Sequence, residues 1–415
     1  MDFDKNFIYY LFLAFLLIEF SVGAFLSYLN KTKWSDKLPE ELKEIYDEKE
    51  YKKSMEYEKE KYIFSKVSGI FSAVIIFIFV AFGFFGKIFD FIISLNFGEF
   101  ISSLLFFGIL FLAQNIFSLP FSYYYNFVIE KKFGFNKMDK KIFFTDFLKS
   151  LILGFIIGGI IISLIMFFYF FFKQYFWLLA WLFMTLFSIF MMMFYSNIIV
   201  PIFNKQTPLE DGPLREKIQN FAKKVGFELD NIFVIDGSKR STKANAYFSG
   251  FGPKKRIVLF DTLINDLTDE ELVSVLAHEI GHYKKKHTLQ MLSFSIIQTG
   301  IIFYILGIIL SNPVFSQALG SNTGSFAVGI LAFSILFSPI SMIFGIFGNI
   351  LSRKNEYEAD FYAGTNYSSL DLKNALIKLS KNNLSNLRPH QAYEFVYYSH
   401  PTVLKRLKAL DKIKT

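Results

Sequence analysis

The sequence predicts a polytopic α-helical membrane protein that also carries a smaller α+β part outside the membrane. Of the 415 residues, 53% are apolar, and most of the 56 Phe residues fall in long apolar blocks. Blocks of about 20 apolar residues are long enough to cross a bilayer as helices. The sequence contains no Cys, which excludes a disulfide scaffold, a thiolate metal site and a Cys nucleophile.

Seven apolar blocks qualify as membrane spans. In chain order they cover residues 7–29, 63–85, 100–123, 147–172, 175–200, 289–310 and 325–351. Only Lys173 and Gln174 separate the fourth block from the fifth, which predicts a tight turn. The first block lacks a basic leader, so we expect it to stay in the membrane as a span.

The placement of lysine predicts the orientation of the spans. Basic residues crowd the loops 28–62 and 126–149, the segment 201–288 and the tail 352–415, whereas the intervening loops are nearly bare. These four parts are therefore expected in the cytoplasm, with the N-terminus outside. The net charge of +8 fits this topology and anionic lipid head groups. Without an arginine-rich patch, we expect no nucleic-acid partner.

The segment 201–288 has a mixed α/β pattern outside the membrane. Its apolar spacing predicts a helix over 214–225 and a strand over 231–235. Two further strands, 244–249 and 256–260, are joined by a Gly/Pro-rich stretch, which predicts a hairpin.

The next helix is expected to carry the chemistry. Thr268 followed by Glu271 forms a capping box that predicts a helix over 269–286. On this helix lies the sequence HEIGH, with His278 and His282 one turn apart on one face, so both can bind one metal ion. Glu279 is offset toward a water on that ion, the pattern of a zinc metalloprotease helix. The alternative is a chance match on a surface helix.

A catalytic zinc site needs a third protein ligand. The segment that follows the last span contains Glu356, Glu358 and Asp360. Glu356 and Asp360 lie four residues apart, so one can bind the metal while the other holds a ligating His. Spacing alone does not choose between Glu356 and Glu358, and an exposed acidic helix face is the alternative. His287, just beyond the HEIGH motif, is expected at a helix end or an interface.

Six sequence blocks resemble those of the type I CAAX prenyl proteases, a family of seven-span membrane zinc metallopeptidases. They are EKKFGFN, PIFNKQTPLEDG, SKRSTKANAYFSGFGPKKRIVLFDTL, HEIGH, SRKNEYEAD and YYSHPTVLKRLKAL. The resemblance covers essentially the whole chain. One difference is that the family often has His-Ser where this chain has Lys243-Ala244.

The resemblance implies roles for particular residues. Glu356 becomes the third zinc ligand, and Asp360 orients a ligating His. His400 and Arg406 match positions near the active site, where they can stabilise an oxyanion or hold a substrate carboxylate; an amphipathic C-terminal helix is the alternative for both. The strand Asn245-Ala246-Tyr247-Phe248 resembles an edge that pairs with the substrate backbone, with Asn245, Ala246 and Tyr247 as the expected substrate-binding residues. The alternative is a plain hairpin strand.

The resemblance also implies an architecture. Seven transmembrane helices surround an interior chamber, and a cytoplasmic gluzincin-like α+β zinc metalloprotease domain caps it. Residues 1–200 hold five spans and two basic loops, and 201–288 form the catalytic segment. Residues 289–351 hold two more spans, and 352–415 supply the third ligand. Polar residues within the spans would face the chamber; these are Glu19, Gln114 and Asn115.

The expected function is a membrane zinc endopeptidase with one zinc ion per chain. The resemblance implies that it removes the C-terminal tripeptide from prenylated CAAX-type peptides at the lipid bilayer. A monomer is the expected oligomeric state. A general quality-control protease for membrane proteins is the alternative within this class. A polytopic transporter and a catalytically dead scaffold that binds prenylated tails are alternatives from other classes. The Lys-, Asn-, Ile- and Phe-rich composition predicts a bacterial inner membrane, or the endoplasmic reticulum if the source is eukaryotic.

Overall fold

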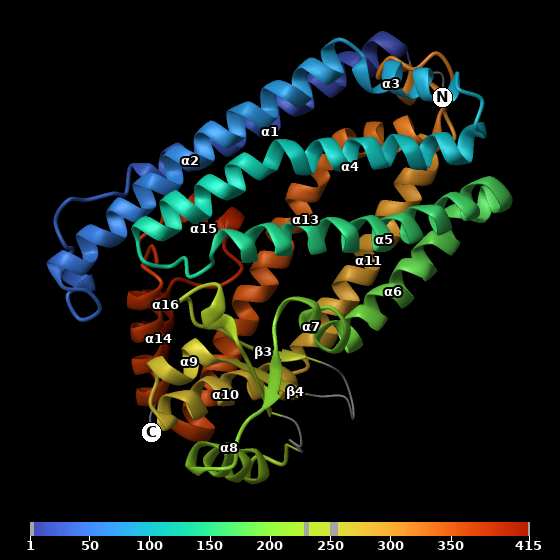
Figure 1. Ribbon diagram of the computed structural model, residues 1–415. Coiled ribbons are helices and arrows are strands. Elements are labelled where there is room, and N and C mark those ends of the chain that lie inside the picture. The colour runs from blue at the N-terminus through green and yellow to red at the C-terminus, as the bar shows by residue number, and fades with distance from the viewer. Residues whose placement is uncertain (1–3, 228–231, 250–255, 414–415) are drawn as a thin grey trace.

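The computed structural model describes residues 4–227, 232–249 and 256–413. Long helices dominate it (Figure 1). Seven of them match the predicted spans: α1 (Lys5–Lys31), α2 (Glu48–Ala81), α4 (Gly98–Tyr124), α5 (Lys140–Phe172), α6 (Phe176–Ile198), α11 (His287–Leu310) and α13 (Phe326–Ala363).

By length and hydropathy, six stretches of the described chain can cross a membrane. One of them, Lys140–Phe203, is 64 residues long and contains both α5 and α6. Figure 1 shows α5 and α6 meeting at the turn that joins them and diverging from it. That turn is the 3₁₀ segment Lys173–Tyr175, which begins with Lys173 at a φ of 39°. The polytopic helical fold is therefore confirmed, and counting α5 and α6 separately gives the seven predicted spans.

The spans bury little of their surface against one another. In the most apolar 18 residues of each stretch, only 6% to 22% of the residues are buried within the protein. Glu19 and Gln114 are exposed, and the Asn115 side chain donates to the Phe111 carbonyl of its own helix at 2.8 Å. The interior chamber stays a prediction.

A four-stranded sheet forms the α+β part. Its strands are β1 (Gln206–Pro208), β2 (Ile232–Ile235), β3 (Ala246–Ser249) and β4 (Arg256–Phe260), in the order β1-β2-β4-β3. The central β2 and β4 are parallel, and the outer strands pair antiparallel to them. The three predicted strands are confirmed, although the proposed hairpin join, residues 250–255, lies outside the described residues. Strand β1 was not expected.

The remaining helices pack around this sheet or link the spans. They are α3 (Phe84–Ile93), α7 (Val200–Phe203), α8 (Pro213–Lys224), α9 (Asp261–Asp266), α10 (Asp269–Lys284), α12 (Val314–Ala318), α14 (Ser369–Asn382), α15 (Gln391–Tyr397) and α16 (Val403–Leu410).

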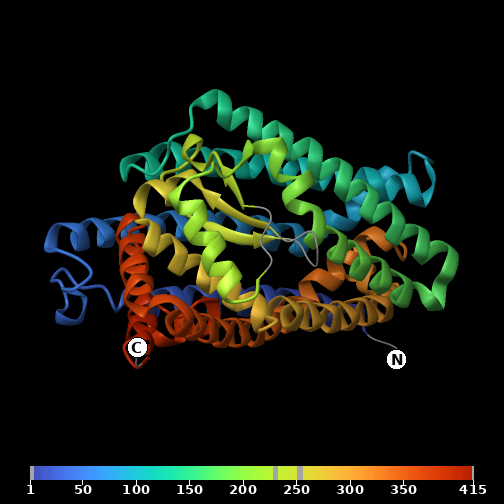
Figure 2. The same cartoon turned by 90° about the horizontal axis from the view of Figure 1, so that it is seen from below.

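One sheet face forms a core with α8, α10, α14 and α16. It contributes the buried Ile232, Ile257 and Leu259. Figure 1 shows these elements at one end of the long helices, and Figure 2 shows the sheet and α8 in front of them when seen from below. The segment before α11 and the tail after α13 thus fold into one unit, as expected if both lie on the same side of the membrane.

Candidate metal centre

Helix α10 carries the HEIGH motif and begins at the predicted capping box. Thr268 Oγ1 accepts a hydrogen bond from the Glu271 backbone N–H at 3.3 Å, and Glu271 Oε2 accepts one from the Thr268 N–H at 2.8 Å. Lys378 of α14 donates to the same Glu271 oxygen at 2.7 Å. These bonds fix the start of α10 against the core, and His278 and His282 follow on one face of the helix.

Glu356 meets both His residues, although α13 delivers it from a distant part of the sequence. The Nε2 atoms of His278 and His282 lie 3.1 Å apart. Glu356 Oε2 is 3.5 Å from His278 Nε2, and Glu356 Oε1 is 3.3 Å from His282 Nε2. Gly281 permits this approach, because a Cβ at that position would lie only 3.2 Å from the Ala359 Cα of α13.

These three side chains fit a metal ion. One ligand atom from each lies within 4.8 Å of the other two. Glu356 is only 4% exposed, and its Oε2 receives no hydrogen bond from any described residue; Arg406 Nη1 is 3.3 Å away but outside hydrogen-bond geometry. A buried carboxylate oxygen that accepts no hydrogen bond still lacks a partner, and a bound metal ion would be one. Two imidazoles and a carboxylate are a common donor set for a divalent ion.

Asp360 and Arg406 hold His278 in place. His278 Nδ1 donates to Asp360 Oδ1 at 2.9 Å, which leaves Nε2 directed at the cluster. Arg406 donates to both Asp360 oxygens, from Nη2 at 2.6 Å and from Nε at 2.8 Å. Although burial opposes protonation, the neighbouring carboxylates of Asp360 and Glu356 raise the pKa of His278 to about 9. A metal ion must therefore displace a proton to bind there.

His287 belongs to the centre, although the sequence indicated only a helix end or an interface. Lys286, with a φ of 61°, separates α10 from α11 and turns His287 back toward the motif. The buried His287 places its Nδ1 3.0 Å from His282 Nδ1 and its Nε2 3.2 Å from Glu358 Oε2. Glu358 thus reaches the centre through His287 and is not part of the metal cluster. The sequence signal that could have predicted this contact was the presence of a third His shortly after the HEIGH motif.

Glu279 and His400 lie beside the cluster with different exposure. Glu279 is half-buried, and burial raises the pKa of its carboxyl above the ordinary value. The His400 side chain is 61% exposed, and its Nε2 lies 3.3 Å from Glu356 Oε1. Arg406, by contrast, is 8% exposed and faces Asp360. His400 and Arg406 were both expected near the site, and of these two His400 is the one whose side chain is accessible to solvent and to a substrate.

The candidate substrate strand is the edge strand β3. It pairs with β4 alone in the described sheet, with Ala246 opposite Leu259 and Tyr247 opposite Val258. Phe248 packs against Tyr283 of α10 with ring centroids 5.6 Å apart. Because Tyr283 directly follows His282, β3 runs beside the end of the metal-site helix. Asn245, just before the strand, is exposed.

Lys243, which departs from the family pattern, has an anchoring role. Its Nζ donates to Glu130 Oε2 at 2.7 Å and to the Tyr57 hydroxyl at 2.9 Å, and it lies 4.5 Å from the Phe135 ring centroid. Glu130 is 6% exposed. The start of the β3 segment is therefore tied to α2 and to the EKKFGFN block after α4.

Comparisons with known proteins agree with this architecture. The family profile "CAAX prenyl protease N-terminal, five membrane helices" matches residues 27–205, and the profile "Peptidase family M48" matches residues 208–414. The chain is 37% identical to CAAX prenyl protease 1 of Saccharomyces cerevisiae, over 96% of this chain and 94% of the relative. It is 31% identical to the human CAAX prenyl protease 1 homolog, over 91% and 89% of the two chains.

A solved structure is similar over the whole fold. The crystal structure of S. mikatae Ste24p superposes with a TM-score of 0.91 at 37% identity, covering 99% of this chain and 100% of that one. The bundle of spans and the α+β part that carries the HEIGH helix thus share their fold with that protein. The chain belongs to peptidase family M48, in its CAAX prenyl protease branch, and is a multi-pass membrane metalloprotease.

Proposed function

We propose that the chain is a zinc endopeptidase that removes the C-terminal tripeptide from prenylated CAAX-type peptides. The observation that carries the proposal is the convergence of His278, His282 and Glu356 beside Glu279. The printed names of the relatives, CAAX prenyl protease 1 and its homologs, support the substrate class. A prenyl chain would concentrate such a substrate at the membrane that holds the enzyme.

His278, His282 and Glu356 are the proposed zinc ligands. A bound zinc ion supplies a Lewis acid that polarises water and the scissile carbonyl. Asp360 keeps the Nδ1 proton on His278, so that Nε2 presents its lone pair to the ion. Arg406 balances the charge of Asp360 and acts on the site through it, as a positioning residue.

Glu279 is the proposed general base and acid. It accepts a proton from the attacking water and donates it to the amine nitrogen that leaves. Burial raises its pKa toward neutrality, which makes its carboxylate a better proton acceptor than an exposed Glu. The exposed His400 is placed to donate a hydrogen bond to the oxyanion or to the substrate carboxylate.

The backbone of Asn245, Ala246 and Tyr247 is proposed to bind the substrate by strand addition. An edge strand offers unpaired backbone groups that bind an extended peptide with little demand on its sequence. Its neighbour Phe248 contacts Tyr283, next to the metal-site helix. A peptide added to β3 would thus run close to the cluster.

The topology of the proposed enzyme follows from its lysines. Segments 201–288 and 352–415 form the catalytic unit on the cytoplasmic side, and residues 1–200 and 289–351 provide the spans. The identity of the membrane and the monomeric state remain predictions.

The test uses the full-length chain reconstituted in lipid. A farnesylated CAAX peptide and its unfarnesylated twin are incubated with wild type, with Glu279→Gln and with Glu270→Gln, and products are identified by mass spectrometry. Glu270 lies on the same helix but is exposed and pairs with Lys217 on the surface. We expect Glu279→Gln to bind metal normally and to lose about 10²- to 10⁴-fold in kcat.

Each alternative predicts a different result. Full cleavage by Glu279→Gln would refute the mechanism. Equal cleavage of both peptides, together with cleavage of unfolded membrane polypeptides, would favour a quality-control protease. Binding without cleavage by wild type would favour a scaffold, and ion flux in liposomes would favour a transporter.

A further inference from the structure

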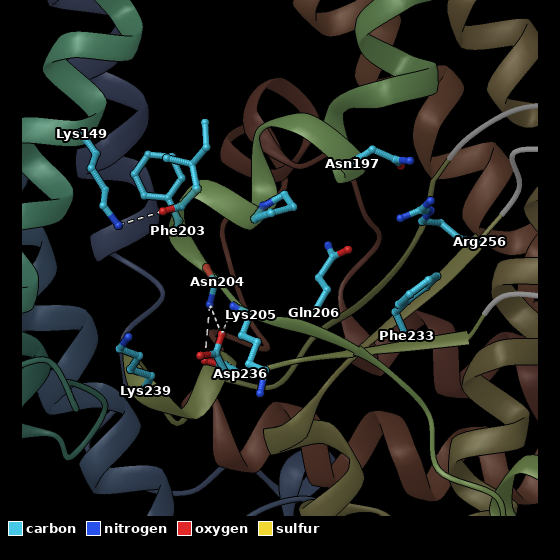
Figure 3. Close-up of a pocket in the computed structure, with 12 residues that line it drawn as sticks. Lys149, Asn197, Phe203, Asn204, Lys205, Gln206, Phe233, Asp236, Lys239 and Arg256 are labelled. Carbon is cyan, nitrogen blue, oxygen red and sulfur yellow. Dashed lines mark hydrogen bonds between the residues drawn. The ribbon is translucent and has the colours of Figure 1, made fainter.

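A pocket of about 600 Å³ lies on the sheet face opposite α10 (Figure 3). Its wall is built from β1, β2 and β4, from α7 and from the turn after β2. Lys149 of α5 and Asn197 near the end of α6 complete it. The pocket therefore opens where the sheet meets the ends of two candidate membrane spans. It does not include any residue of the metal centre.

Positive charge dominates the lining of this pocket. Four cations line it, Lys149, Lys205, Lys239 and Arg256, and none of them forms an ion pair with a described residue. Figure 3 shows Lys149 and Lys239 on one side and Arg256 on the other. Unpaired cations that share one concave site raise the local positive potential and attract anions.

The one acidic lining residue, Asp236, is already engaged by neutral donors. Its Oδ1 accepts hydrogen bonds from the Lys205 backbone N–H at 2.8 Å and from the Asn204 side chain at 3.1 Å. Its carboxylate thus shapes the turn after β2 and pairs with none of the lysine ammonium groups.

Two of the cations are held in position. Lys149 Nζ donates one hydrogen bond to the Ile202 carbonyl of α7 at 2.8 Å, which leaves two further N–H groups. The Arg256 guanidinium lies 4.8 Å from the Phe233 ring centroid, and burial lowers its pKa. A guanidinium that is partly desolvated without a carboxylate is well suited to bind a phosphate group.

Apolar side chains continue from the pocket along the spans. Leu148 and Ile152 of α5 are 54% and 51% exposed, and Ile198 at the end of α6 is 48% exposed. Both helices lie in a stretch long and apolar enough to cross a membrane. If an amphiphile placed its anionic group in the pocket, its apolar chains could contact these exposed side chains, which lie within one helical turn of the lining residues Lys149 and Asn197.

We propose that this pocket binds the phosphate headgroup of an anionic phospholipid, in the leaflet on the side of the metalloprotease unit. Lys149, Lys205, Lys239 and Arg256 contact the phosphate oxygens, and the acyl chains lie along α5 and α6. This site is separate from the peptide site, so binding there does not depend on the proposed substrate.

Binding can be measured without any peptidase assay. Purified full-length protein in detergent is titrated with phosphatidic acid or with phosphatidylcholine, and bound lipid is counted by native mass spectrometry. The variant Lys205→Ser/Lys239→Ser removes two exposed lysines of the pocket. The matched control Lys223→Ser/Lys408→Ser removes two exposed lysines elsewhere.

We expect wild type and the control to bind phosphatidic acid more tightly than phosphatidylcholine. The pocket variant should bind phosphatidic acid about 30-fold more weakly, about fivefold for each lysine lost. Equal affinity of the pocket variant and the control would overturn the proposal. Displacement of the lipid by an equal concentration of inorganic phosphate would also overturn it, because the site would then bind a soluble anion. An unchanged unfolding temperature of both variants verifies their folding.

Discussion

Asp360→Asn tests how the acidic segment after the last span supports the metal site. Asp360 is 1% exposed and receives three hydrogen bonds or ion-pair contacts, one from His278 and two from Arg406. The substitution keeps the shape of the side chain and removes its charge. Asn also offers only one acceptor oxygen, so at least one of these donors loses its partner.

Two separate losses follow from this geometry. The Arg406 guanidinium, 8% exposed, would keep only Glu356 as a nearby carboxylate, at 3.3 Å. Removing one partner of a buried ion pair costs about 3–5 kcal/mol, and the remaining Glu356 contact places this case near 3 kcal/mol. Loss of the group that orients a ligating His weakens metal affinity by about 10- to 100-fold.

The assay separates the two losses. Thermal unfolding of the chelated protein reports the ion pair, and zinc competition with a chromogenic chelator reports the metal affinity. Asp411→Asn is the matched control, because Asp411 forms a surface ion pair with Lys373 that is worth about 0–1 kcal/mol. Zinc affinity in Asp360→Asn equal to that of Asp411→Asn would refute the reasoning.

Three further predictions concern the metal and its surroundings. Chelation should lower the unfolding temperature of wild type, and added zinc should restore it, because only the folded site binds the ion. An unchanged unfolding temperature would show that the metal does not stabilise the fold. His287→Phe should weaken zinc binding about tenfold in the same competition assay, by removing the contact to His282 Nδ1. Glu130→Gln should destabilise the protein by about 1–3 kcal/mol, because it weakens the buried acceptor of Lys243. Adding Lys243→Met should recover part of this loss in a double-mutant cycle, and strict additivity would contradict the coupling.

The elements with local signals could be predicted from the sequence. The capping box at Thr268 and Glu271 located the start of α10, and its end differs by only two residues from the expected one. The apolar blocks located all seven long helices. Strand β1 escaped prediction because it has only three residues and ends with Pro208.

Features that depend on tertiary packing could not be predicted from spacing. Glu356 and Glu358 lie on one helix, and the choice between them depends on how α13 rotates against α10. Close packing of Ala359 on Gly281 turns Glu356 toward the cluster and leaves Glu358 to His287. His287 itself required the left-handed Lys286, a backbone turn that no apolar pattern reveals.

The most direct test of the account is zinc K-edge spectroscopy of the purified full-length protein, with wild type and Glu356→Gln compared. We predict one zinc per chain in wild type, with two imidazole nitrogens at about 2.0–2.1 Å and a carboxylate oxygen at about 2.0–2.2 Å. The oxygen shell should change and the zinc content fall in Glu356→Gln. An identical spectrum and zinc content in the two proteins would show that Glu356 is not a ligand and would contradict the account.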